Sequence, residues 1–227
     1  MLKNYLASSI GKKQLIAVSG LAMVGFLIAH LAGNFLIFAG PEAYNAYSQG
    51  LKDLGALLWV ARLGLIGAFL IHFPLTIMLV RQNRKARAVN YSQALHKDTR
   101  TLSTKLMPFS GLVLLVYVVT HLIDFTFTHA SEANAMVNGE YLGLYGLVVN
   151  EFANPIESLW YIVAMVAVGF HLMHAVQSVF QTFGFNHKVY TPVIKKVSCV
   201  VGIGIAVGFA SIPLYVLFRC ASGSCGV

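Results

Sequence analysis

Five long apolar runs constrain this chain more than any other feature of its sequence. They cover roughly residues 14–38, 55–80, 106–128, 156–182 and 193–218. Each is long enough to cross about 30 Å of hydrocarbon, which takes about 20 helical residues. Only 11% of the 227 residues are charged, whereas a water-soluble domain has roughly a quarter. The sequence therefore predicts an all-α integral membrane protein of five transmembrane helices, with residues 1–227 forming a single domain.

Basic residues gather on one side of the predicted spans. They precede the first span and fill the loops after the second and fourth spans: Lys3, Lys12, Lys13, Arg81, Arg84, Lys85, Arg87, Lys97, Arg100, Lys105, Lys188, Lys195 and Lys196. The loop at roughly 129–155 contains no Lys or Arg. The positive-inside rule therefore predicts a cytoplasmic N-terminus and an outside C-terminus. The net charge of +8 then suits acidic lipid or an acidic protein partner, and it requires no nucleic acid.

The three cysteines fall near the end of the chain. Cys199 lies in the last apolar run, where we expect a small core residue. Cys220 and Cys225 follow that run on the predicted outer side. In an oxidising compartment they are candidates for a disulfide.

Histidines inside the spans carry the functional information. His30, His72, His121 and the pair His171 and His174 fall in four different spans. Ionisable side chains are costly to bury in a membrane, so a function is the default interpretation. One such histidine alone more often makes an interhelical hydrogen bond. Four spans with histidines favour ligand binding.

Two of these histidines lie at one depth. His30 comes 17 residues after Lys13, and His121 comes 16 residues after Lys105. With a 1.5 Å rise per residue, both lie about 25 Å from the inner boundary of the membrane. They are therefore expected at the same level, in the outer half.

The other histidines lie at a second depth. His72 comes nine residues before Arg81, or about 14 Å from the inner side, and His171 and His174 lie about 12 to 20 Å from it. Levels about 10 Å apart cannot serve one metal ion, whose nitrogens converge to about 2 Å. Two bis-histidine sites remain, and a haem between helices of a bundle fits each. The chain has no C-x-x-C-H motif, which favours b-type haem.

Short motifs along the chain resemble a known family. They are S-S-I-G-K-K from Ser8, H-L-A-G-N from His30, G-P-E-A-Y-N from Gly40, G-L-V-L-L-V-Y-V-V-T-H-L from Gly111 and F-H-L-M-H-A-V-Q-S-V-F-Q-T-F-G from Phe170. Their order and spacing resemble the single five-helix, dihaem cytochrome b membrane anchor of succinate dehydrogenase and fumarate reductase. The resemblance covers most of the chain and implies a four-helix haem bundle plus a fifth helix.

The resemblance implies an electron-transfer function in the bacterial cytoplasmic membrane. It makes His30 and His121 the ligands of a distal, outer haem b, and His72 and His171 the ligands of a proximal, inner haem b. A flavoprotein with FAD and an iron-sulfur protein would dock on the cytoplasmic face, and succinate and fumarate would react there. Electrons would pass between the iron-sulfur clusters, both haems and a quinone, expected to be menaquinone. A higher oligomer of the complex is left open.

Polar residues near the expected haems are candidates for propionate contacts. His174 lies one turn closer to the cytoplasm than His171, where it could hydrogen-bond a propionate with help from Arg81 or Ser178. Arg62, at the outer side of the second span, is a candidate ion-pair partner for the outer haem.

The resemblance implies a quinone site near the outer haem, so polar groups at the outer ends of the first two spans are candidates for it. Glu42 and Asp53 are candidate bases for quinol oxidation, and Asn45 is a candidate polar contact. Some family members carry a glutamate two residues before the ligand in span four. Gly169 stands there in this chain, so we expect no compensating proton path through this position.

Two other interpretations stay open at the level of sequence. One is the haem b anchor of a hydrogenase or formate dehydrogenase, although its catalytic subunit would dock on the outer side, away from the basic loop. The other is a proton or metal transporter with intramembrane histidines. Transporters usually show repeats and broken helices; Pro74 and Pro213 lie inside spans, but no repeat is visible.

Overall fold

The computed structural model describes residues 5, 8–85 and 102–225. This part of the chain contains five helices that are long and apolar enough to cross a membrane: Ser9–Ala39, Ala56–Asn83, Leu106–Phe127, Pro155–Thr182 and Tyr190–Ala221. Each coincides with one of the five apolar runs. The prediction of an all-α, multi-pass membrane protein is therefore confirmed.

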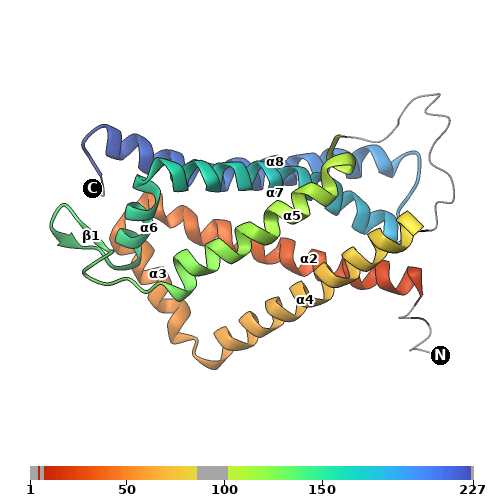
Figure 1. Ribbon diagram of the computed structural model, residues 1–227, viewed down its shortest axis with the longest axis horizontal. Coiled ribbons are helices and arrows are strands. Elements are labelled where there is room, and N and C mark those ends of the chain that lie inside the picture. The colour runs from red at the N-terminus through yellow and green to blue at the C-terminus, as the bar shows by residue number, and fades with distance from the viewer. Residues whose placement is uncertain (1–4, 6–7, 86–101, 226–227) are drawn as a thin grey trace.

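The long helices run side by side along the molecule (Figure 1). They are α2 (Ser9–Asn34), α4 (Ala56–Lys85), α5 (Leu102–Leu122), α7 (Pro155–Thr182) and α8 (Tyr190–Ala221). The smaller elements gather at one end, which we call the α3–α6 end. They are the 3₁₀ turn η1 (Phe35–Ala39), α3 (Pro41–Asp53), the π-helical turn η2 (Ile123–Phe127), β1 (Met136–Val137), β2 (Glu140–Tyr141) and α6 (Gly143–Ala153).

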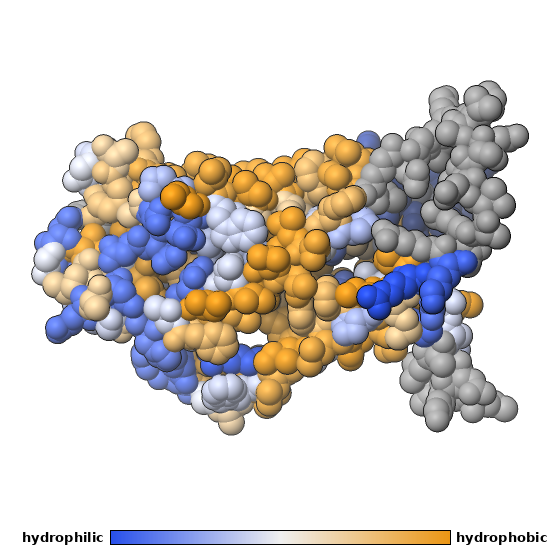
Figure 2. All heavy atoms as spheres, in the orientation of Figure 1, coloured by the Kyte–Doolittle hydropathy of each residue, from blue (hydrophilic) through white to orange (hydrophobic). Residues whose placement is uncertain are grey.

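Helices α2 and α7 form the centre of the bundle. Helix α2 packs against α4, α7 and α8, and α7 packs against α2, α5 and α8. Figure 2 shows the molecule hollowed between α4 and α5, and it shows apolar side chains along the middle with hydrophilic ones gathered at the α3–α6 end. The bundle therefore has loose packing between α4 and α5, and tight packing between α7 and α8.

The α7–α8 contact depends on two glycines. A Cβ atom on residue 202 would lie 2.7 Å from the carbonyl oxygen of Gly169, and one on residue 169 would lie 3.1 Å from the Cβ of Ala206. Small residues let membrane helices approach closely and gain van der Waals contact. Gly169 and Gly202 therefore set the distance between these helices.

Local signals explain where the helices begin and end. The Ser8 hydroxyl accepts a hydrogen bond from the Gly11 amide (3.1 Å) and caps α2. Gly40 has a φ of 100°, which residues with a side chain rarely adopt. This conformation ends η1 and turns the chain into α3. The Asn154 side chain caps α7 by accepting from the Ile156 amide (3.0 Å).

The α3–α6 end is folded where the sequence suggested only loops between spans. Asn45 joins two of its elements: its amide donates to the Leu142 carbonyl (2.8 Å), and its oxygen accepts from the Tyr145 amide (3.1 Å). Most of α6 is buried and forms a core with Tyr44 of α3. Both halves of the Asn45 amide therefore bind backbone and hold α3 against α6.

Two of the three cysteines are bonded to each other, and the third is free. Cys220 and Cys225 form a disulfide with a Cα–Cα distance of 4.0 Å at the α3–α6 end. The expectation for Cys199 is wrong: its side chain is exposed on the surface of α8. A small apolar side chain costs little on a surface that faces hydrocarbon, so hydropathy alone cannot separate a buried from a lipid-facing position.

Part of the predicted basic surface lies outside the described residues. Lys3, Arg87, Lys97 and Arg100 are in this group, and so are the side chains of Arg84 and Lys105. Among the described residues, Lys12, Lys13 and Arg81 lie at the end of the bundle opposite the α3–α6 end, where α2 begins and α4 ends.

Candidate functional site

His30 of α2 and His121 of α5 face each other near the α3–α6 end. Their ring centroids are 5.8 Å apart, and the ring planes differ by 83°. A metal held by one nitrogen of each ring at about 2 Å would place the centroids about 6 Å apart. The observed separation therefore suits one metal centre between the two imidazoles.

One nitrogen of this pair has no partner. The Nδ1 atom of His121 is buried and makes no hydrogen bond to any described residue. Leaving a buried polar atom unsatisfied costs about 1–3 kcal/mol. Such an atom in a histidine pair points to a ligand that the chain alone does not supply.

Aromatic side chains surround the pair. They pack against His30 or His121 with ring centroids 5.1 to 6.1 Å apart: Phe26, Phe209, Tyr117, Phe125 and Tyr161. This apolar shell limits water access, and burial and polarity are among the properties by which a protein tunes a bound redox centre.

His72 of α4 is oriented by α2. Its Nδ1 atom lies 3.0 Å from the Ile16 carbonyl oxygen and 3.4 Å from the Ser19 hydroxyl. Donation from Nδ1 to that carbonyl leaves Nε2 as the acceptor nitrogen, the arrangement in which histidine usually binds a metal. The ring lies against Gly20, where a Cβ atom would be 3.0 Å from its Cε1.

His171 of α7 has a similar environment on the other side of the bundle. Its Nδ1 atom lies 3.2 Å from the Ser110 hydroxyl, and its Cε1 lies 3.7 Å from where a Cβ on Gly111 would be. His171 interacts electrostatically with both His72 and His174. The structure thus brings His72, His171 and His174 into one neighbourhood.

The structure does not bring together the candidates for the quinone site and the outer propionate contact. The Arg62 guanidinium lies 5.1 Å over the Trp59 ring, and Asp53 accepts a hydrogen bond from Gln49 (2.8 Å). Both of these side chains and that of Glu42 are exposed. The contacts of Arg62 and Asp53 are with neighbours one turn away on their own helices, so the three side chains form no shared site.

The candidates for the second propionate site lie on α4 and α7. Arg81 is exposed near the end of α4, and Ser178 is half-buried in α7. The Ser178 carbonyl accepts a hydrogen bond from the Thr182 hydroxyl (2.8 Å). His174 is half-buried one turn further along α7 than His171.

An acidic cluster near His121 was missed at the level of sequence. Carboxylate oxygens of Asp124, Glu151 and Glu157 lie within 4.8 Å of one another, and Tyr161 donates a hydrogen bond to Asp124 (2.7 Å). Burial raises the pKa of Glu151, and the neighbouring Asp124 and Glu157 carboxylates raise it further. The available signal was Asp124 itself, a carboxylate within a span and three residues after His121.

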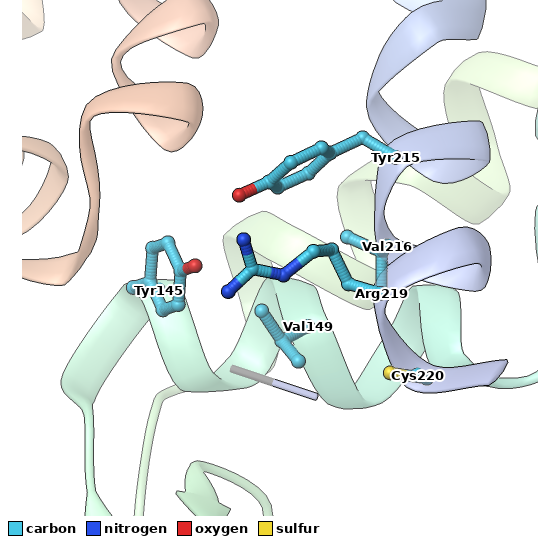
Figure 3. A pocket seen from close by; sticks show the side chains of 6 residues that line it. All are labelled: Tyr145, Val149, Tyr215, Val216, Arg219 and Cys220. Carbon is cyan, nitrogen blue, oxygen red and sulfur yellow. The ribbon is translucent and has the colours of Figure 1, made fainter. Parts of the chain in front are cut away.

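Arg219 ties the end of α8 to α6. Figure 3 shows its guanidinium extended between Tyr215 and Tyr145. It lies 5.7 Å from the Tyr215 ring centroid, and its Nε donates to the Ser224 carbonyl (3.3 Å). Burial and the nearby Tyr215 raise the pKa of Tyr145, while Arg219 acts in the opposite direction. The recess has no volume open to a water molecule, so this contact is structural.

No protein-family model matches this chain, and neither does any curated protein or any solved structure. The function proposed for the chain therefore depends on the histidine geometry and on the resemblance of its motifs.

Proposed function

We propose that this chain is the membrane anchor and electron-transfer subunit of a succinate:quinone oxidoreductase. It would pass electrons between an iron-sulfur subunit and a membrane quinone through two b haems. The observation that carries the proposal is the His30–His121 pair, with its 5.8 Å separation and its unpartnered buried nitrogen. A second histidine group at another depth, on α4 and α7, supports two centres rather than one.

Four histidines are available to hold the two haems that this function needs. His30 and His121 would hold the haem nearer the α3–α6 end, and His72 and His171 would hold the other. A bound haem supplies one-electron redox chemistry. The chain itself orients the ligands: the Ile16 carbonyl fixes the Nδ1 side of His72, and the Ser110 hydroxyl contacts Nδ1 of His171.

Two observations support a cytoplasmic N-terminus in a bacterial inner membrane. Lys12, Lys13 and other basic residues lie at the end opposite α3 and α6, as the positive-inside rule requires of the cytoplasmic side. The Cys220–Cys225 disulfide lies at the α3–α6 end, and disulfides persist in oxidising compartments such as the periplasm. The flavoprotein and iron-sulfur subunits would then dock on the basic, cytoplasmic end.

The quinone, which we expect to be menaquinone, would react near the outer haem. Glu42 and Asp53 stay candidate proton acceptors because both carboxylates are exposed at the α3–α6 end. Quinol oxidation requires a base within hydrogen-bond reach of the quinol hydroxyl, and either carboxylate would supply one.

A pyridine haemochrome titration of the purified chain tests the proposal. We expect two haems per chain with low-spin b-type bands, and one haem in His30→Ala. The exposed His129→Ala is the matched control and should keep two. One haem or none in the unaltered chain would refute the proposal. Co-purification followed by assays with succinate, hydrogen and formate separates this complex from a hydrogenase or formate dehydrogenase.

A further inference from the structure

The imidazole ring of His30 is held between two side chains of its own helix. Phe26, one turn before, stacks on it with centroids 5.1 Å apart and planes 16° apart. The amide nitrogen of Asn34, one turn after, lies 3.4 Å from both ring nitrogens. Equal distances within the ring plane would make that nitrogen collide with the hydrogen on Cε1, so the amide lies over a face of the ring. Phe26 and Asn34, one turn before and one turn after, therefore both restrain the ring.

Asn34 is itself fixed at both ends of its amide. Its nitrogen donates to the His30 carbonyl (2.8 Å), and its oxygen accepts from the Tyr44 hydroxyl (3.0 Å). Tyr44 belongs to α3, and its ring is buried against Tyr145 with centroids 6.2 Å apart. Burial, with a smaller effect from Tyr47, raises the pKa of Tyr44 to about 12. Its hydroxyl therefore stays protonated and donates across the physiological pH range.

We propose that Tyr44 and Asn34 are positioning residues that fix the plane of the His30 imidazole, and thereby the angle between the two axial imidazoles of the outer haem. The proposal rests on the proposed function, because the angle has a consequence only if both histidines bind iron. The plane of His121 is set separately, by stacking on Tyr117 at 5.6 Å and 29°. The 83° between the two imidazoles is then held by contacts from α3 on one side and α5 on the other.

The angle has an electronic consequence. Each axial imidazole donates π density to the iron d orbital perpendicular to its ring plane. Perpendicular rings treat two of these orbitals alike, which gives ferric haem an electron paramagnetic resonance signal with a large maximal g value. Rotation toward parallel rings separates the orbitals, lowers that g value and shifts the reduction potential. If Asn34 only capped the end of α2, loss of the Tyr44 hydroxyl would change neither the g value nor the reduction potential.

The test compares Tyr44→Phe with Tyr47→Phe. Both variants keep the ring and lose a hydroxyl on the same helix. Tyr47 packs against Gly33, and its hydroxyl has no hydrogen bond to any described residue. Each haem-loaded chain is examined by haemochrome titration, electron paramagnetic resonance and redox titration, with the inner haem as internal reference. In Tyr44→Phe we expect two haems, a lowered maximal g value and a shifted potential for the outer haem only. Tyr47→Phe should match the unaltered chain.

An unchanged outer signal and potential in a fully loaded Tyr44→Phe would overturn the proposal. A second measurement needs no haem: nuclear magnetic resonance of ¹³Cε1-labelled histidines in the haem-free chain. The His30 signal should broaden or shift in Tyr44→Phe while the His72 signal stays, and an unchanged His30 signal would likewise overturn the proposal. An unaltered chain that binds no haem would instead refute the proposed function, so the two failures are distinguishable.

Discussion

Gly202 offers a test of the bundle that is independent of function. A Cβ atom on residue 202 would lie 2.7 Å from the Gly169 carbonyl oxygen, 2.7 Å from Cγ of Met173 and 3.1 Å from the Met173 backbone nitrogen. The Met173 side chain can rotate away, but the backbone atoms move only if α7 and α8 separate. Gly202→Ala should therefore strain the close contact between α7 and α8.

Gly204 provides the matched control on the same helix. A Cβ atom there would meet nothing within 4 Å. Both alanine variants gain about the same helix propensity, roughly 1 kcal/mol, so this gain cancels in the comparison. The remaining difference is the overpacking cost at Gly202, about 1–3 kcal/mol. Since 1 kcal/mol shifts the melting temperature of a chain of this size by roughly 2–4 °C, a cost near 2 kcal/mol predicts a gap of about 4–8 °C.

Circular dichroism monitors the thermal unfolding of both variants in the same detergent. Gly202→Ala should melt several degrees below Gly204→Ala. If the two variants melt together, or if Gly202→Ala melts higher, then α7 and α8 do not approach each other through these glycines.

Three further predictions concern the histidines, the acidic cluster and the proton balance. His171→Ala should abolish the inner haem, whereas His174→Ala should keep both haems; the reverse pattern of haem loss would exchange their roles. The raised pKa of Glu151 means that the folded state holds its proton more tightly than the unfolded state. The resulting stability is full below the ordinary carboxyl pKa and is lost as pH rises through the raised one, so the melting temperature should fall over that window, and Glu151→Gln should flatten the fall. Turnover with quinol should be electrogenic in vesicles, since Gly169 cannot titrate and a larger side chain there would meet Ala206; vesicles without a membrane potential would count against this.

Membrane spans could be predicted from the sequence because the signal is local. A run of about 20 apolar residues is stable in hydrocarbon only as a helix that satisfies its own backbone. The same local rise per residue placed His30 and His121 at one level, and the structure brings their rings within 5.8 Å. The pairing could be anticipated because depth along a straight helix depends only on residue count.

The α3–α6 end could not be predicted in the same way. Its contacts join residues far apart in the chain, such as Asn45 with Leu142 and Tyr161 with Asp124. Helices α3 and α6 are too short to span a membrane and therefore read as loops, although α6 is apolar and mostly buried. Which loop folds against which depends on packing in three dimensions, and no local pattern carries that information.

By itself, then, the sequence determined how many helices are long and apolar enough to cross a membrane and at which depth each histidine lies, because both follow from hydropathy and helical rise. Only the tertiary structure decided which side chains surround those histidines. Tyr44 reaches Asn34, and Asn34 covers His30, because the turn at Gly40 folds α3 back over the end of α2. The orientation of an imidazole ring depends on such contacts between elements, whereas its depth depends only on its own helix.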